Sequence, residues 1–414
     1  MAIKFKTILL AWLMGLSSSY ADTTATDYLL SKNIALSTGA VLKAGTQWYK
    51  EPDIQRLKNE LEKGTYTGDM DWAQKVVWGY DIMTNTYATI GDIRTDGRAP
   101  LYSGKFMNCS SCHDEGGIVP NAYPFFRTAT YFGLRNPNDP NNAAQTGERY
   151  GALGYYRDTI TAVKDCGINC SSAHIPQDSE EMDAVVAWIF AVRDGIYQGE
   201  GLINEFKVLS DVDKIPGARL PVFSRVTTDA TFQANPLAGK KVYDRYCVSC
   251  HGKDGRGKWN KKIGYTDPPV AGIGSYTKAG APNMVPIMAS FIKQEMPPAR
   301  PNSLTEQQAI DVAGYISTMY HESRWWTDYY FEHNPCGRPA FMPLDVGSIP
   351  NGYPFSAKQT QFGPWKPIND WLKSTVCTTN ANNKILTPIL TENFDAGYNG
   401  VKFVKPINIP EPRR

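Results

Sequence analysis

The sequence predicts a mainly α-helical protein with two helical domains, long loops and an extended C-terminal arm. The motif Cys-x-x-Cys-His occurs twice, at Cys109 and at Cys247, and each copy lies between two segments with helical periodicity. A length of 414 residues fits two or three compact domains better than one. Apolar residues make up 42% of the chain, an ordinary share for a protein that forms a core.

The first motif is expected to lie between a helix at about 72–83 and a helix that begins at Asp178. Glu181 follows Asp178 by three residues, which is the spacing of a capping box. Apolar residues recur at helical spacing in the closing helix and give it one apolar face: Met182, Val185, Val186, Ile189 and Phe190.

The second motif directly follows a helix expected at 237–246. Asn235 is a suitable cap for this helix, and Pro236 occupies the first helical position. The closing helix is expected to start at Thr305, because Gln308 completes a second capping box there.

The other segments separate or flank these two units. The predicted divisions are a leader at 1–21, an N-terminal extension at 22–70, a first domain at 71–196, a linker at 197–231, a second domain at 232–320 and a C-terminal extension at 321–414. The extension has some helical character around 53–63. The C-terminal extension is rich in Pro, Gly, Asn and Thr and shows little periodicity, which predicts an arm packed over both domains.

The first 21 residues have the pattern of a secretory signal peptide. Lys4 and Lys6 precede a short apolar run at 8–16, and Ser19 and Ala21 place small residues at the cleavage-reading positions. The apolar run is short for a membrane anchor, and no other stretch reaches the roughly 18 apolar residues of a spanning helix. We therefore expect cleavage after Ala21, export to the periplasm, and a mature chain without a transmembrane segment.

The charge of the chain argues against nucleic acid as a partner. The formal net charge is +2 at pH 7, and no run of Lys or Arg supplies the clustered positive surface that phosphate binding needs.

Each Cys-x-x-Cys-His motif predicts a covalently bound haem c. Two thiols three residues apart can form thioethers with the two vinyl groups of one porphyrin, and the adjacent histidine then binds the iron. The expected attachment residues are Cys109, Cys112 and His113 for the first haem, and Cys247, Cys250 and His251 for the second. A zinc site needs a second ligand pair close by, and a thioredoxin-like dithiol needs a βαβ pattern; the sequence has neither.

The second haem is expected to have Met296 as its sixth ligand. Met296 precedes Pro297 just before the closing helix, the place where small c-type cytochromes supply a thioether to iron. Met284, Met288 and Lys293 are the alternatives. A backbone carbonyl near Pro268 or Pro269 is expected to accept the ring N–H of His251.

Four of the eight cysteines lie outside the two motifs. Cys336 and Cys377 are expected to form a disulfide, because thiols of exported proteins tend to pair. Cys166 and Cys170 lie one helical turn apart, so that a disulfide between them is one interpretation.

Several segments resemble the thiosulfate dehydrogenase family. The first domain does so through Gly79-Tyr-Asp-Ile, the motif at 108–113 and Asp178-Ser-Glu-Glu-Met; the second does so through 239–243, 291–297 and 303–316. The resemblance covers about residues 70–320. It implies interconversion of thiosulfate and tetrathionate in the periplasm, at a first haem ligated by histidine and a cysteine thiolate, with electrons leaving through the second haem.

Counted back from the Asp178 motif, the family's ligand cysteine falls within about one residue of Cys166. The resemblance therefore implies Cys166 as the distal ligand of the first haem, with Cys170 and His174 as alternatives. A dianionic substrate also needs cationic donors, for which guanidinium groups are suitable. The candidates for this role are Arg127, Arg149 and Arg157.

The sequence thus predicts a periplasmic di-haem cytochrome c oxidoreductase. Its substrate is expected to be a small sulfur oxyanion, and its electron partner a periplasmic cytochrome or oxidase. The alternative is a non-catalytic di-haem electron carrier between periplasmic enzymes and a respiratory complex. In that case His174 or a methionine such as Met182 would complete an inert first haem. A di-haem peroxidase matches only in the haem motifs.

Overall fold

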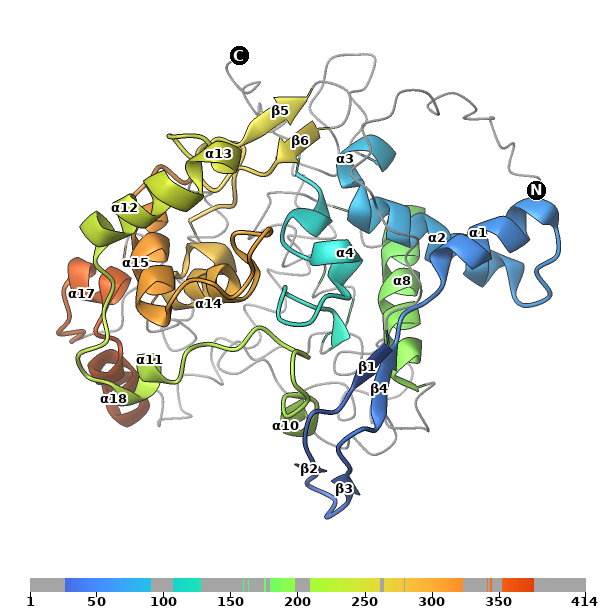
Figure 1. Ribbon diagram of the computed structural model, residues 1–414, viewed down its shortest axis with the longest axis horizontal. Coiled ribbons are helices and arrows are strands. Elements are labelled where there is room, and N and C mark those ends of the chain that lie inside the picture. The colour runs from blue at the N-terminus through green and yellow to red at the C-terminus, as the bar shows by residue number, and fades with distance from the viewer. Residues whose placement is uncertain are drawn as a thin grey trace.

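The computed structural model describes residues 27–90, 107–126, 128, 159, 163, 175, 179–197, 209–260, 264–278, 280–322, 341, 343–344 and 352–375. Helices dominate this part of the chain, and its strands form small two-stranded antiparallel sheets (Figure 1). The predicted mainly α fold is confirmed. Among the described residues, no helix combines the length and apolar character needed to cross a membrane.

The elements of the N-terminal half are β1 (Asp27–Leu29), β2 (Ile34–Ala35), β3 (Val41–Leu42), β4 (Gln47–Lys50), α1 (Ile54–Lys63), α2 (Met70–Thr84), α3 (Thr86–Thr89), the 3₁₀ turn η1 (Cys109–Ser111), α4 (Asp114–Gly117), α8 (Glu180–Tyr197) and α10 (Leu209–Val212). The elements that follow are α11 (Arg225–Thr228), α12 (Pro236–Tyr246), α13 (Val248–His251), β5 (Lys258–Asn260), β6 (Gly264–Asp267), η4 (Ala281–Asn283), α14 (Val285–Glu295), α15 (Glu306–Ser317), α17 (Ala357–Phe362) and α18 (Lys366–Thr375).

Buried apolar residues of the described chain form two clusters, which define what we call the first and second domains. The first cluster runs from Leu30 to Ala218, and the second from Phe223 to Ile368. In Figure 1, α2 and α8 lie on one side of the molecule, α12, α14 and α15 lie on the other, and α4 lies between them.

The first domain is centred on the packing of α2 against α8, and a glycine allows their close approach. A Cβ atom at Gly79 would lie 1.9 Å from the carbonyl oxygen of Ala184, so only glycine fits there. Helix α8 begins at Glu180, and Ser179 Oγ accepts the backbone N–H of Met182 at 3.1 Å, as a capping side chain does. Asp178, the predicted cap, lies outside the described residues.

The second domain repeats this arrangement with α12 and α15. A Cβ atom at Gly239 would lie 1.9 Å from the carbonyl oxygen of Asp311. The caps predicted for both helices are confirmed. Asn235 accepts the N–H groups of residues 237 and 238, and Thr305 and Gln308 form a reciprocal capping box.

The N-terminal residues preceding α1 contribute to the first core. Strands β1 and β4 pair with Tyr28 opposite Tyr49, and the Tyr49 side chain is fully buried. The rings of Trp48 and Tyr49 pack edge-on against Phe126, with centroids 5.0 and 4.6 Å away.

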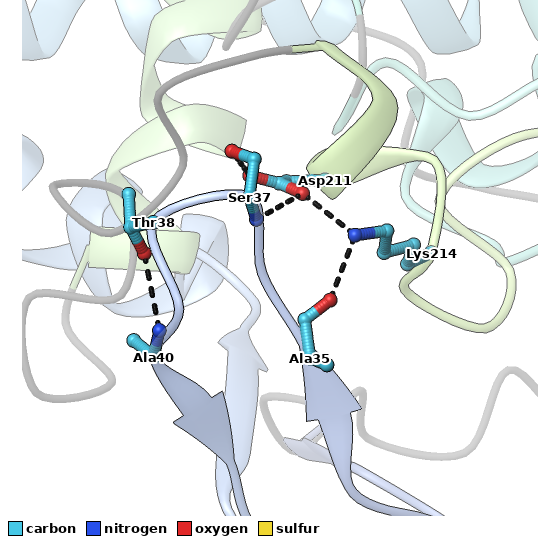
Figure 2. Close-up of polar contacts among 6 residues, drawn as sticks. All are labelled: Ala35, Ser37, Thr38, Ala40, Asp211 and Lys214. Atoms are coloured by element: carbon cyan, nitrogen blue, oxygen red, sulfur yellow. Dashed lines mark hydrogen bonds and ion pairs between the residues drawn. The ribbon is translucent and has the colours of Figure 1, made fainter.

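A polar cluster joins the β2–β3 hairpin to α10 (Figure 2). The buried Asp211 carboxylate accepts the backbone N–H and the hydroxyl of Ser37, the latter at 2.5 Å. Lys214 Nζ donates to Asp211 at 2.9 Å and to the Ala35 carbonyl at 2.7 Å. Burial raises the pKa of Asp211, but the hydrogen bonds from Ser37 and Lys214 outweigh it, so that the pKa lies below its ordinary value.

Residues 352–375 depart from the predicted aperiodic arm, because they form α17 and α18 and enter the second core. Trp365 and Ile368 are fully buried there, and Trp365 Nε1 donates to the Thr360 carbonyl at 2.9 Å. The Phe362 carbonyl accepts the backbone N–H of Ala234 at 2.7 Å. Each helix is too short to leave a clear periodic signal in the sequence.

Candidate haem sites

The end of α2 and the start of α3 hold the first Cys-x-x-Cys-His motif. Thr86 Oγ1 accepts the backbone N–H of Cys109 at 2.8 Å, and Ser110 donates to the Thr84 carbonyl at 3.0 Å. A further hydrogen bond joins the same two segments, because the Asn108 side chain accepts the backbone N–H of Tyr87 at 3.0 Å. These bonds fix Cys109 at the end of a helix packed into the first core.

His113 is oriented by the loop that follows it. Its Nδ1 lies 2.5 Å from the Tyr123 carbonyl oxygen, and its ring stacks on Phe125 with centroids 4.4 Å apart. A carbonyl can only accept, so the proton lies on Nδ1 and the lone pair of Nε2 is left to bind a metal.

This loop depends on left-handed backbone conformations. Gly117 has φ 87°, and a Cβ there would lie 2.1 Å from the Phe125 ring. Tyr123, whose carbonyl accepts from His113, has φ 50° although it carries a side chain. Trp188 of α8 supports the loop, because its Nε1 donates to the Gly116 carbonyl at 2.8 Å.

Carboxylates gather beside His113. Burial raises the pKa of Asp114, and burial together with the charges of Asp114 and Glu51 raises the pKa of Glu115. Burial, and next the charge of Asp114, also raises the pKa of Glu295 at the end of α14. Asp114 is thus close enough to both Glu115 and Glu295 for its charge to raise their pKa values.

The second motif follows α12 without a break. Cys247 is the C-cap of α12, and α13 contains the remainder of the motif. His251 Nδ1 lies 2.7 Å from the Pro268 carbonyl oxygen, which confirms the predicted acceptor. Burial lowers the pKa of His251 and favours the neutral imidazole that iron requires.

Glycines shape the turn after His251. Gly255 and Gly257 have φ angles of 74° and 67°. A Cβ at Gly257 would lie 2.2 Å from the Asp267 carbonyl oxygen. The backbone N–H of Gly257 also donates to the His251 carbonyl at 2.9 Å, so the turn closes on the motif itself.

Met296 lies at the C-cap of α14, and its side chain is half-buried beside the second core. The alternative ligands of the second haem are also described. Met284 and Met288 are buried at 7% exposure, and the Lys293 ammonium donates to the Asn302 carbonyl at 2.8 Å. The role of Met296 as an iron ligand stays a prediction, with Met284, Met288 and Lys293 as the alternatives.

The residues present at these sites fit a covalently bound porphyrin. Burial raises the pKa of the Cys247 thiol to about 12, so that this cysteine is a neutral thiol at neutral pH when no haem is attached. Cys247 and Cys250 do not form a disulfide. The Tyr276 hydroxyl and the Asn283 side-chain oxygen are buried without a hydrogen-bond partner among the described residues, as expected where a polar edge of a bound group belongs.

Several predicted site residues lie outside the described residues: Arg127, Arg149, Arg157, Cys166, Cys170, His174, Cys336 and Cys377. The same holds for the leader at 1–21. Met182 is described and is fully buried in the first core.

Three residues that form hydrogen bonds with the first motif or the loop after it were not predicted from the sequence: Thr86, Tyr123 and Trp188. Thr86 precedes the motif by more than twenty residues, and Trp188 follows it by more than seventy. Tyr123 acts through its backbone carbonyl, and because every residue has such a carbonyl, the residue type gives no indication of this role. The Pro124 that follows it is a weak signal of a turn.

The chain is similar to several known proteins. Residues 234–316 match the family model described as cytochrome c oxidase, cbb3-type, subunit III. A thiosulfate dehydrogenase of Psychrobacter arcticus is 25% identical over 251 residues, which are 61% of this chain and 64% of that protein. A solved thiosulfate dehydrogenase (TsdBA) from Marichromatium purpuratum is 20% identical, with a TM-score of 0.47, covering 69% of this chain and 56% of that one. The chain thus spans less than two thirds of either protein.

The helical fold, the two motifs and the matching family model define a c-type cytochrome that binds haem c. A thiosulfate dehydrogenase of Allochromatium vinosum is 36% identical over 230 residues, which are 54% of this chain and 73% of that protein. The chain belongs to the thiosulfate dehydrogenase family, as its sequence motifs predicted.

Proposed function

We propose that this protein interconverts thiosulfate and tetrathionate at its first haem site and exchanges electrons with its partner through the second. The 36% identity to the Allochromatium vinosum enzyme carries this proposal. Oxidation joins two thiosulfate dianions through one new S–S bond and releases two electrons without a proton. Two one-electron sites can hold these two electrons.

The proposal assigns one haem to Cys109, Cys112 and His113, and another to Cys247, Cys250 and His251. When bound, haem c supplies a one-electron Fe(III)/Fe(II) couple. The Tyr123 and Pro268 carbonyls fix the tautomers of His113 and His251, so that the Nε2 lone pair of each histidine would be available to bind iron. The predicted division into domains at 71–196 and 232–320, with a linker at 197–231, is part of this proposal.

The two sites are expected to have different potentials. A thioether from Met296 favours ferrous iron and raises the potential of the second haem. A thiolate from Cys166 stabilises ferric iron and lowers the potential of the first. With haem bound at both sites, electrons from thiosulfate would pass from the first site to the second, and from there to a cytochrome or oxidase.

The charge distribution bears on where the substrate binds. Asp114 and Glu115 directly follow His113, and their negative charges, together with that of Glu51, would repel a dianion. We place the substrate on the opposite side of the first haem, with Cys166. Arg127, Arg149 and Arg157 are the candidates to hold its oxygens.

We infer that the protein works in the periplasm. The signal-peptide pattern at 1–21 supports export with cleavage after Ala21, and covalent haem attachment through thioethers suits an exported chain. Mass spectrometry of the mature protein tests this, with an N-terminus at Asp22 expected.

The activity test is an assay of purified holoprotein with thiosulfate and ferricyanide, in which tetrathionate is detected directly. We expect one tetrathionate for each two ferricyanide ions reduced. A di-haem protein that exchanges electrons with partner cytochromes but forms no tetrathionate would instead be an electron carrier.

The distal ligand of the first haem is tested by electron paramagnetic resonance. Thiolate ligation should give a low-spin signal with compressed g-values that is lost in Cys166→Ala and kept in Cys170→Ala. If both variants retain every haem signal and full turnover, Cys166 is not the ligand, and His174 becomes the leading candidate.

A further inference from the structure

Two aromatic pairs connect the haem-binding parts of the first and second domains. Tyr87 of α3 contacts Trp259 of β5 with ring centroids 5.3 Å apart, and Tyr123 contacts Phe291 of α14 with centroids 5.4 Å apart. The two pairs differ in what their tyrosine does. Tyr87 lies beside the Cys109 segment, whereas Tyr123 also supplies the carbonyl that accepts from His113.

The Tyr123–Phe291 contact links the two proposed axial ligands. His113 is bound to Tyr123 through one hydrogen bond, and Phe291 lies five residues before Met296 on the helix that ends there. One side chain of the first domain therefore contacts the ligand-bearing helix of the second, while its own backbone holds the ligand of the first.

The backbone at Tyr123 needs support from its surroundings. A residue with a side chain at φ 50° is in a sparsely populated region, and such a conformation persists where neighbouring contacts maintain it. The base of the loop is closed by a hydrogen bond from the Phe125 N–H to the Gly117 carbonyl at 2.8 Å. The ring of Phe291 packs against the side chain at the strained position itself.

We propose that Tyr123 is a positioning residue that couples the geometry of His113 to the docking of α14, with Phe291 as its partner. This inference rests on the assignment of a haem to the first motif. A firm hydrogen bond from Nδ1 makes the imidazole a stronger donor to iron and stabilises the ferric state. When the Phe291 ring is lost, the Tyr123 carbonyl moves, this hydrogen bond weakens and the potential of the first haem rises.

The test is potentiometry of the holoprotein, followed by visible absorption, for Phe291→Leu and Trp259→Leu. Each variant removes one aromatic ring of the second domain that contacts a tyrosine of the first. We expect a raised midpoint potential for the first haem in Phe291→Leu and an unchanged one in Trp259→Leu. The first haem is the one whose reduction leaves the thioether-to-iron absorption band unaltered.

Tyr123→Leu and Tyr123→Phe provide an independent pair that does not alter α14. Tyr123→Leu should raise the potential as Phe291→Leu does, and Tyr123→Phe, which keeps the ring, should not. If the potential of the first haem is unchanged in both Phe291→Leu and Tyr123→Leu, Tyr123 has no positioning role. If Trp259→Leu raises this potential as much as Phe291→Leu does, the effect comes from the docking of the two domains in general, and the positioning role is also overturned. The haem content of the wild-type protein, measured by mass, tests separately whether a haem is attached to the first motif. A wild-type chain without haem on Cys109 and Cys112 would refute both the haem assignment and the positioning role of Tyr123.

Discussion

The two domains share one helix crossing but support their haem motifs differently. Gly79 and Gly239 permit the same close approach of two helices, because a Cβ atom at either position would lie 1.9 Å from a carbonyl oxygen of the facing helix. In the second domain, α12 runs directly into Cys247. In the first, α2 ends at Thr84, and Cys109 is fixed by hydrogen bonds from the chain that follows this helix.

The supports of the first motif also come from farther away in the sequence. Trp188 of α8 holds the loop after His113, and the linker carbonyl of Gly217 accepts the N–H of Asn121 at 3.1 Å. The second motif is closed by its own glycine turn and by Pro268. The second motif is therefore supported by residues close to it in the sequence, whereas the first depends on residues from distant segments.

The largest effect is expected from removing either pair of attachment cysteines. Cys109→Ala/Cys112→Ala should lose the first haem and all thiosulfate turnover, whereas Cys247→Ala/Cys250→Ala should lose the second haem and keep a first haem that thiosulfate still reduces. Protein mass and stopped-flow absorption measure these outcomes. A protein with zinc or no haem at either motif would contradict the proposed function.

A change at Met296 tests the difference in potential between the two sites. Met296→His should lower the potential of the second haem and abolish the thioether-to-iron band, because imidazole stabilises ferric iron better than a thioether does. Met288→Leu is the control, since Met288 is buried in the second core. If Met288→Leu removes the band and Met296→His does not, the ligand assignment is wrong.

The two helix crossings are compared by Gly79→Ala and Gly239→Ala. In each variant the new Cβ meets a backbone carbonyl and forces the helices apart, which we expect to cost about 1–3 kcal/mol of unfolding free energy. Thermal unfolding of both holoproteins should show similar losses of stability, because the new Cβ would lie 1.9 Å from a carbonyl oxygen in each variant. A variant as stable as the wild type would show that its helix pair can separate freely.

The next change is made in the contact between the β2–β3 hairpin of the first domain and α10. Asp211→Asn replaces a buried, hydrogen-bonded carboxylate and should cost about 1–3 kcal/mol at neutral pH. The pKa of Asp211 is lowered in the folded state, so its stabilising contribution is present above the unfolded pKa of about 3.9 and is lost as pH falls through the folded value. Denaturant unfolding should therefore show the two proteins converging in acid.

Asp244→Asn is the matched control in the second domain. Asp244 pairs with Lys240 on the exposed surface of α12, where both side chains are about half exposed. Little change in stability is expected there at any pH. A loss as large as that of Asp211→Asn would refute the distinction between the two carboxylates.

Local patterns were sufficient for much of the fold. Asn235 and the Thr305–Gln308 pair were predicted as caps because a cap involves residues within one turn. At the start of α8 the structure shows Ser179 accepting the N–H of Met182, whereas Asp178, the predicted cap, lies outside the described residues. Residues 352–375 were assigned to an extended arm because Trp365 and Ile368 alone leave no periodic pattern.

The sequence by itself determined the haem motifs, the main helices and the family resemblance, and it limited the acceptor of the His251 ring N–H to a carbonyl near Pro268 or Pro269. Each of these is carried by residue types at short, fixed spacings. Only the tertiary structure decided that the Tyr123 carbonyl accepts from His113, that Asp211 binds the Ser37 segment, and that Tyr123 meets Phe291. Every residue except proline carries the same N–H and C=O groups, so which distant segments come together depends on the packing of the whole chain.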